Sequence, residues 1–235
     1  MFDLLKKIRK VDAVDNTGAV LLPELRAPFD GLMFGGLGLQ KLLSDCDFET
    51  VLDVGSGAGS HSAIMADKGK QVTAIDFGTS VYAAKHKDGI EYVAGNYLTH
   101  SFGRKFDLVW ACHVLEHQPN PNLFLKKLLD DTADGGILAI TVPPAKQKIV
   151  GGHVTIWNAG LVLYQLVLAG NNCRSASVLR YGYNITVLVH RKPIKALPEL
   201  TYDSGDIDRL SEYFPAGLSE PFDGDINELN WDSFC

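Results

Sequence analysis

The chain has few cysteines and no long apolar run, and each scarcity argues against a class of protein. Only four of the 235 residues are cysteines, and none of them forms a Cys-x-x-Cys pair. This spacing argues against a zinc knuckle or a thioredoxin-like redox site. The longest apolar run covers residues 161–169, whereas a helix needs about 20 apolar residues to span a bilayer. We therefore expect no membrane-spanning segment.

Basic side chains are also scarce. The 22 Lys and Arg residues are outnumbered by 28 Asp and Glu residues, which gives a formal net charge of −6. Domains that bind nucleic acids need a basic surface, so we expect no nucleic-acid partner. The first residues lack the apolar core and cleavage site of a secretory signal, which favours a cytoplasmic protein. Because the cytosol keeps thiols reduced, we expect no disulfide, and we expect Cys235 to be simply exposed.

Acidic charge gathers at the end of the chain. Residues 201–235 contain nine acidic side chains and one basic side chain, Arg209. The same segment contains six aromatic residues: Tyr202, Tyr213, Phe214, Phe222, Trp231 and Phe234. A solvated acidic tail has no need for so many aromatic rings, so we expect it to dock on its own domain or on a second copy, as in a homodimer. Plain disorder is the alternative.

Strand and helix patterns alternate in the middle of the chain. Strands are predicted at 50–54, 71–75, 90–93, 106–111 and 136–142, and helices at 60–68, 79–86 and 121–130. This alternation is typical of an α/β fold, a parallel sheet with helices on both faces. A helix over 157–169 and two tightly joined runs, 173–181 and 182–190, predict a final antiparallel hairpin. We divide the chain into an N-terminal helical segment and lid (1–47), a main domain (48–192) and a tail (193–235).

A glycine-rich turn after the first strand is the strongest functional signal. It contains Gly55, Gly57 and Gly59, and glycines let a chain turn sharply and let a ligand approach its backbone. Asp76 ends the next strand, where nucleotide-binding sheets use an acid to accept ribose hydroxyls. A dinucleotide site would need Gly or Ala at position 60, which is serine. Asp53 would repel a pyrophosphate and attract the ammonium group of an amino acid, which points to S-adenosylmethionine.

Together these residues resemble the class I S-adenosylmethionine-dependent methyltransferases over roughly residues 48–190. The resemblance also rests on Gly95–Leu98, Phe106–Val109 and Val114–His117. It implies a methyltransferase with a Rossmann-like, seven-stranded, mostly parallel sheet in the order 3-2-1-4-5-7-6, with strand seven antiparallel. It also implies a cofactor site made of Asp53, Gly55, Gly57, Gly59, Asp76, Phe77, Asn96, Tyr97 and Ala111. The family often has Asp where this chain has Asn96, whose side-chain carbonyl can still accept a hydrogen bond from adenine.

A second cluster follows the fourth strand. His113, Glu116 and His117 fall on one face if this loop is helical, and residues after strand ends line the cleft of open α/β sheets. His153 follows the fifth strand, after two glycines that we expect to make its loop mobile. Such ligands suit Zn, Mn, Fe, Co or Ni. The set resembles metal-dependent O-methyltransferases of the ubiquinone pathway and small-RNA 2′-O-methyltransferases, whose pattern is Glu-x-x-Glu-His, so that His113 replaces the first Glu.

Two chemical interpretations of this cluster stay open. In one, His113, Glu116, His117 and His153 hold a divalent metal that binds two adjacent substrate oxygens. In the other, no metal binds and His117 or His113 is a general base. The segments 28–34 and 143–157 are expected to form a substrate lid that suits a sugar or another polyol. We therefore expect O-methylation of a small polar molecule such as a sugar or vicinal diol; N- or C-methylation without a metal and a non-catalytic cofactor-binding partner subunit are the alternatives.

Overall fold

The structure, a computed structural model, describes residues 22–78 and 87–235. The first 21 residues of the predicted N-terminal helical segment (1–47), and the helix predicted over residues 79–86, lie outside the described residues. The helical elements are η1 (Phe29–Gly31), α1 (Gly36–Asp45), α2 (Ser60–Asp67), η2 (Tyr97–Thr99), η3 (Leu115–His117), α3 (Pro121–Asp131), α4 (Ala159–Leu168), α5 (Asp206–Arg209) and η4 (Ser211–Tyr213). The strands are β1 (Thr50–Val54), β2 (Gln71–Asp76), β3 (Ile90–Ala94), β4 (Phe106–Cys112), β5 (Thr132–Val142), β6 (Ser177–Tyr181), β7 (Asn184–His190) and β8 (Glu228–Leu229).

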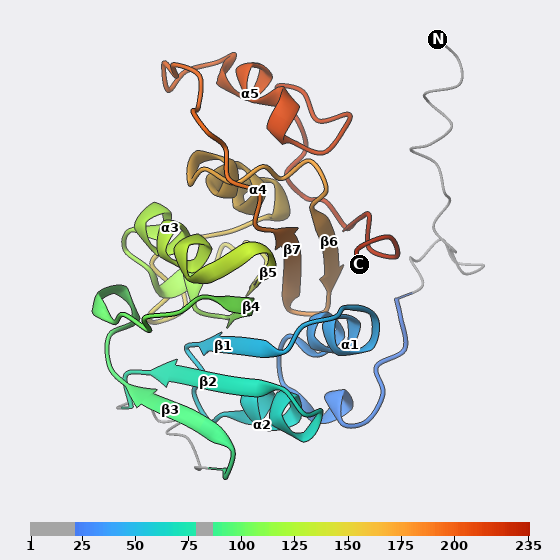
Figure 1. The fold of residues 1–235 in the computed structure, drawn as a ribbon. Helices are drawn as coiled ribbons and strands as arrows, with labels where there is room; N and C mark the ends of the chain where they lie inside the picture. The colour runs from blue at the N-terminus through green and yellow to red at the C-terminus, as the bar shows by residue number, and fades with distance from the viewer. Residues whose placement is uncertain (1–21, 79–86) are drawn as a thin grey trace, which may run out of the picture.

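The described strands form one sheet in the order β3-β2-β1-β4-β5-β7-β6-β8 (Figure 1). β1 to β5 pair in parallel, so that Val51 lies beside Val72 of β2 on one side and Leu108 of β4 on the other. β7 runs antiparallel to both β5 and β6. The predicted α/β fold and strand order are confirmed. The short β8 is an addition, because the tail supplies a strand that the sequence pattern did not predict.

Helices cover both faces of the sheet. α1 and α2 pack on one face, where Leu39 of α1 meets Trp110 of β4 in a buried cluster. α3 and α4 pack on the other face, where Phe124 of α3 and Val109 of β4 belong to a second buried cluster. Neighbouring residues of β4 thus face opposite cores, as side chains along a strand must. Because the central strands are buried on both faces, they appear in the sequence as nearly continuous apolar runs. No helix within the described ranges could span a bilayer.

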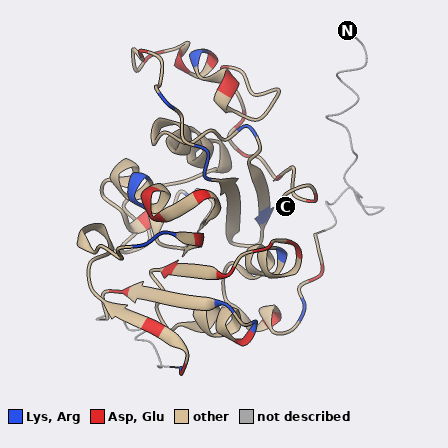
Figure 2. Ribbon diagram, viewed as in Figure 1, with Lys and Arg blue, Asp and Glu red and all other residues tan. Residues whose placement is uncertain are grey.

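The acidic tail packs on its own domain. Phe214 is buried on the α3–α4 face, whereas Trp231 and Phe234 are buried on the α1–α2 face. The ring of Phe234 stacks on that of His190, with the centroids 4.7 Å apart. Figure 2 shows several acidic positions, coloured red, along the ribbon of this segment, and one basic position, coloured blue, in α5. The prediction that the tail docks through aromatic residues is confirmed, although Tyr202 stays 85% exposed.

One acidic side chain of the tail is buried, and backbone N–H groups donate hydrogen bonds to its carboxylate. The carboxylate of Asp206 accepts the N–H groups of Thr201 and Tyr202, at 3.1 and 2.6 Å. Burial raises the pKa of Asp206, but these hydrogen bonds and the nearby Arg209 outweigh it, so the pKa lies below its ordinary value. The ionised carboxylate therefore holds the chain in place at the start of α5.

Cys46 and Cys235 form a disulfide, with their Cα atoms 5.2 Å apart. The prediction that the chain forms no disulfide is therefore wrong. Cys46 directly follows α1, and the packing of Trp231 and Phe234 brings the last residues of the tail onto the α1–α2 face. Two thiols that are 189 positions apart in sequence meet for this reason. Their spacing gives no signal of the contact, because the contact depends on the path of the tail.

Candidate active site

The turn between β1 and α2 has the backbone geometry that its glycines predicted. The N–H groups of Gly55 and Ser56 donate to the carbonyl of Ile75, at 2.8 and 3.2 Å, and hold the turn against β2. Gly55 has a φ of +72°, which residues with a side chain rarely adopt. A Cβ atom at Gly55 would also overlap Val114, in the loop after β4. The glycine therefore lets two loops of the site pack closely.

Gly55→Ala is expected to cost more stability than Gly69→Ala. Both positions have positive φ, +72° and +79°, so each alanine should cost about 1 kcal/mol for its left-handed backbone. A Cβ at Gly69 meets no atom within 4 Å, whereas at Gly55 it meets Val114, which should add about 1–3 kcal/mol. Urea unfolding of both variants measures the difference. Equal losses would contradict the close packing of this turn.

Asp76 stands beside the turn, at the end of β2. One of its carboxylate oxygens accepts the N–H of Gly57 at 3.2 Å, and the other accepts the N–H of Gly78 at 3.1 Å. Each oxygen keeps a further lone pair. Because Asp76 is only partly buried, its carboxylate can still accept hydroxyl groups of a ligand.

Asp53 lies under the same turn, in β1, and is buried. Ser62 of α2 donates a hydrogen bond to its carboxylate at 2.5 Å. Burial raises the pKa of Asp53, against the opposing influence of His61 and Ser62. A positively charged group next to this carboxylate would offset the cost of burying its charge.

The other residues predicted for the cofactor site lie in different surroundings. Phe77 is 64% exposed beside Asp76, and Ala111 is buried within β4. The side chain of Asn96 accepts a backbone N–H at 3.0 Å and so caps η2. Tyr97 is buried, and its hydroxyl donates to Asp131 of α3 at 2.7 Å. Burial and the Asp131 carboxylate raise the pKa of Tyr97. The side chain of Tyr97 thus points to α3, and its part in a cofactor site would be limited to its backbone.

His113 directly follows β4 and has a φ of 55°, which is unusual for a residue with a side chain. Its ring stacks on Phe34, with the centroids 4.0 Å apart. Nε2 of His113 is 3.1 Å from Oδ1 of Asn184. The same Oδ1 accepts the N–H of Gly35 at 3.1 Å, which identifies it as an acceptor. His113 must therefore donate from Nε2, and the lone pair of its neutral ring is on Nδ1.

That lone pair faces Glu116, the central residue of the site. Nδ1 of His113 is 3.4 Å from Oε1 of Glu116. Glu116 is 0% exposed, and neither of its carboxylate oxygens accepts a hydrogen bond from the described residues. Burying a carboxylate that accepts no hydrogen bonds costs free energy. The nearby lone pair on Nδ1 of His113 adds electrostatic repulsion. A proton or a metal cation between the two groups would remove this repulsion.

His117 and His153 complete the cluster. Nδ1 of His117 lies 2.8 Å from the carbonyl oxygen of Gly152 and must donate to it, because a carbonyl only accepts. The lone pair of neutral His117 is therefore on Nε2, which is 3.9 Å from Oε1 of Glu116. Ligand atoms of Glu116, His117 and His153 all lie within 4.8 Å of one another. Three of the four predicted metal ligands thus lie close together. The fourth, His113, is close to the carboxylate of Glu116.

The loop that carries His153 is hydrogen-bonded to the loop after β4; whether it is mobile, as we expected from its glycines, stays a prediction. The backbone N–H groups of Val154 and Thr155 donate to the carbonyl of Glu116, at 2.9 and 3.2 Å. The carbonyl of Gly152 accepts from His117, as described above. These bonds hold His153 against the cluster.

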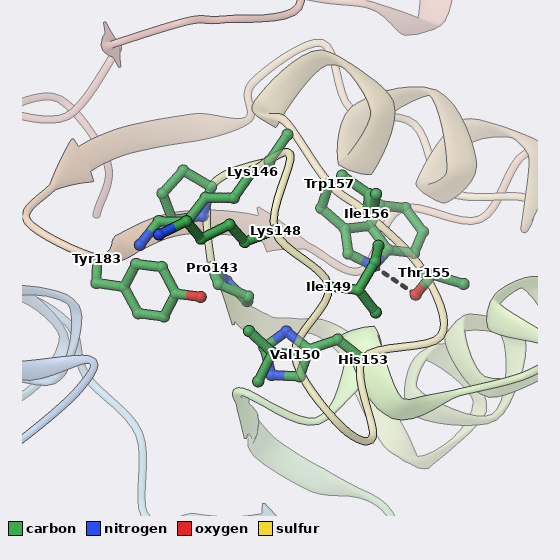
Figure 3. Close-up of a pocket in the computed structure, with 12 residues that line it drawn as sticks. Pro143, Lys146, Lys148, Ile149, Val150, His153, Thr155, Ile156, Trp157 and Tyr183 are labelled. Atoms are coloured by element: carbon green, nitrogen blue, oxygen red, sulfur yellow. Dashed lines mark hydrogen bonds between the residues drawn. The ribbon is translucent and has the colours of Figure 1, made fainter.

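Sequence reasoning missed two residues that shape this site, Tyr183 and Asn184. Both lie at the turn between β6 and β7, and the ring of Tyr183 is 5.9 Å from that of His113. Asn184 is 71 positions from His113 in the sequence, so no local motif could reveal the contact. The antiparallel pairing of β7 with β5 brings them there. Figure 3 shows Tyr183 and His153 lining one pocket together with the loop that follows β5.

Comparison with known proteins identifies part of the chain. Residues 52–140 match the family described as "Methyltransferase domain". The ubiquinone biosynthesis O-methyltransferase of Idiomarina loihiensis is 29% identical over 126 residues, which cover 50% of this chain and 49% of that protein. The chain therefore spans about half the length of this curated relative.

Solved structures share the fold. The N-methyltransferase NodS from Bradyrhizobium japonicum, in complex with S-adenosyl-L-homocysteine, superposes with a TM-score of 0.52 at 19% identity, covering 66% of this chain and 84% of that chain. The [4+2]-cyclase SpnF gives a TM-score of 0.52 at 18% identity, covering 68% of this chain and 82% of that chain. At these identities the likeness shows the fold and not the reaction.

Proposed function

We propose that this chain, which carries a class I S-adenosylmethionine-dependent methyltransferase domain over residues 52–140, methylates an oxygen of a small polar molecule such as a sugar or a vicinal diol. The observation that carries the proposal is the buried carboxylate of Glu116, with ring nitrogens of His113 and His117 within 3.4 and 3.9 Å of its Oε1. O-methylation needs such groups, because the hydroxyl of the acceptor must lose its proton. The fold alone does not select this reaction, since an N-methyltransferase and a cyclase share it.

The residues that would hold S-adenosylmethionine lie around the glycine turn. Asp76 has lone pairs for the ribose hydroxyls, and Asp53 supplies negative charge for the ammonium group. Phe77, Asn96 and Ala111 would border the rest of the cofactor. When bound, S-adenosylmethionine supplies a methyl group on a positively charged sulfur.

Asp76→Asn is expected to weaken binding of S-adenosylmethionine by roughly 10- to 100-fold, because hydrogen bonds to a charged acceptor are lost. Calorimetric titration with S-adenosylmethionine measures the change. Asp88→Asn removes a charge from an exposed position before β3 and is the control. Unchanged affinity in Asp76→Asn would remove the proposed cofactor site.

Within the chain, we assign proton removal to His117. Methyl transfer to the acceptor oxygen would leave the sulfur of S-adenosylmethionine as a neutral thioether, so the acceptor must give up its hydroxyl proton to a group of the protein. The side chain of His117 is 43% exposed and that of His113 is 11% exposed, so His117 is easier for an acceptor to reach. Its Nε2 takes the proton, and the carboxylate of Glu116, 3.9 Å away, stabilises the resulting imidazolium.

The same donor set fits a divalent metal. Glu116 has oxygens that no described donor satisfies, and His117 and His153 place nitrogens within 4.8 Å. The other ring nitrogen of His117 bonds a backbone carbonyl, as is usual for metal-binding histidines. His113 is the fourth candidate ligand, and the set suits Zn, Mn, Fe, Co or Ni. When bound, such an ion supplies positive charge that makes an acceptor hydroxyl more acidic.

The proposal is tested by offering the protein isotope-labelled S-adenosylmethionine with catechols, hexoses and amines. We expect a labelled methyl group on oxygen, identified by mass spectrometry of the product. Loss of turnover with a chelator assigns a metal, and retained turnover assigns the base alone. Labelling of nitrogen or carbon only, or no transfer while the cofactor binds, would refute O-methylation.

A further inference from the structure

A pocket beside the candidate active site is basic, although the chain as a whole is acidic. Its wall comes from the loop after β5 and from Tyr183, and its basic side chains are Lys146, Lys148 and His153. Among the described residues, no Asp or Glu lines it. The net charge of −6 makes this local excess of positive charge a specific feature and not a general property of the surface.

Within the described part of the chain, no carboxylate forms an ion pair with either lysine of this pocket. Nζ of Lys146 lies over the ring of Tyr183, 3.9 Å from its centroid. Figure 3 shows Lys146 and Lys148 on the same side of the pocket as Tyr183. An ammonium held over an aromatic ring keeps its positive charge and remains able to bind an anion.

The pocket and the histidine cluster share one residue and adjoin at a second. His153 lines the pocket and also belongs to the cluster with Glu116 and His117. Tyr183 lines the pocket too, and its ring is 5.9 Å from His113. A small molecule seated against the lysines would therefore reach the histidine cluster with its other end.

We propose that Lys146 and Lys148 bind an anionic group of the methyl acceptor, a carboxylate or a phosphate. This inference rests on the proposed function and narrows its substrate class, from any small polar molecule to one with a hydroxyl at one end and an anion at the other. The apolar residues of the same wall, among them Ile149 and Trp157, pack against the part between the two ends.

The test compares matched pairs of probes by calorimetry, with S-adenosyl-L-homocysteine present. 3,4-Dihydroxybenzoate is paired with the neutral 3,4-dihydroxybenzamide, and glucose 1-phosphate with methyl glucoside. We expect the anionic member of at least one pair to bind on the order of tenfold more tightly, with a preference that shrinks as salt is raised. The pair that shows the preference identifies carboxylate or phosphate.

The double variant Lys146→Gln/Lys148→Gln should abolish the preference, whereas Lys195→Gln, at an exposed position, should keep it. Equal binding within both pairs, no binding of any probe, or a preference that survives in the double variant would overturn the inference. Because the assay measures binding and not turnover, its failure is separate from a failure of methyl transfer. An anion preference without any methylated product would refute the proposed function alone.

Discussion

Glu116→Gln is expected to lower methyl transfer by roughly 10²–10⁴-fold without destabilising the protein. The buried carboxylate of Glu116 has no described hydrogen-bond donor and faces the Nδ1 lone pair of His113 at 3.4 Å. An amide in its place can donate to that nitrogen, so the free energy of unfolding should stay the same or rise by about 1 kcal/mol. The amide cannot stabilise an imidazolium at His117, and it is a poor ligand for Zn²⁺ or Mn²⁺. Activity should therefore fall while the free energy of unfolding does not.

Three measurements check this expectation: labelled methyl transfer, urea unfolding and calorimetric titration with Zn²⁺ or Mn²⁺. Glu199→Gln removes a carboxylate at an exposed position and should leave all three unchanged. If Glu116→Gln keeps full activity, the cluster is not the reacting centre. If the variant instead unfolds easily, the carboxylate is a structural group with partners that the site geometry does not reveal.

Reduction of the disulfide between Cys46 and Cys235 is expected to lower the free energy of unfolding by about 2–4 kcal/mol. The bond joins residues 189 positions apart, so it restricts almost the whole unfolded chain. Its loss should also loosen Trp231, which lies four residues before Cys235 and is buried in the same cluster as α1. Urea unfolding with and without a reductant, followed by tryptophan fluorescence, measures both effects.

Cys235→Ser provides the matched control, because residue 235 is exposed and serine removes little except the bond. The variant should be as stable as the reduced protein and insensitive to reductant. Identical unfolding midpoints for the wild type with and without reductant would show that the bond contributes nothing. A marked sensitivity would mean that the protein reaches its full stability only where thiols can oxidise.

The candidate site could be predicted from the sequence where its parts are close along the chain. Glu116 and His117 follow one strand, and the carboxyl ends of parallel strands meet at one edge of a sheet. His153 could be added because it follows the neighbouring strand β5. Asn184, which fixes the tautomer of His113, comes from an antiparallel hairpin, and its role depends on two hydrogen bonds that only the folded chain forms.

Side-chain direction and the path of the tail were harder to predict than the strands. Tyr97 follows β3, as the cofactor pattern requires, but its hydroxyl finds a partner on α3 because a buried phenol must be hydrogen-bonded. The aromatic residues of the tail predicted docking, yet they could not show that one group packs on each face of the sheet. The disulfide follows from that path and could not be predicted without it.

The short strand β8 gives the tail a further role at the border of the sheet. Val178 and Leu179 of β6 pair with Leu229 and Glu228, and the N–H of Arg180 donates to the carbonyl of Asn227. An uncovered border strand offers its backbone to strands of other molecules and so promotes aggregation. A chain truncated before residue 227 would leave the outer edge of β6 without a paired strand, and we expect such a chain to aggregate. Residues 227–229 thus cover the backbone of a strand that would otherwise border the sheet.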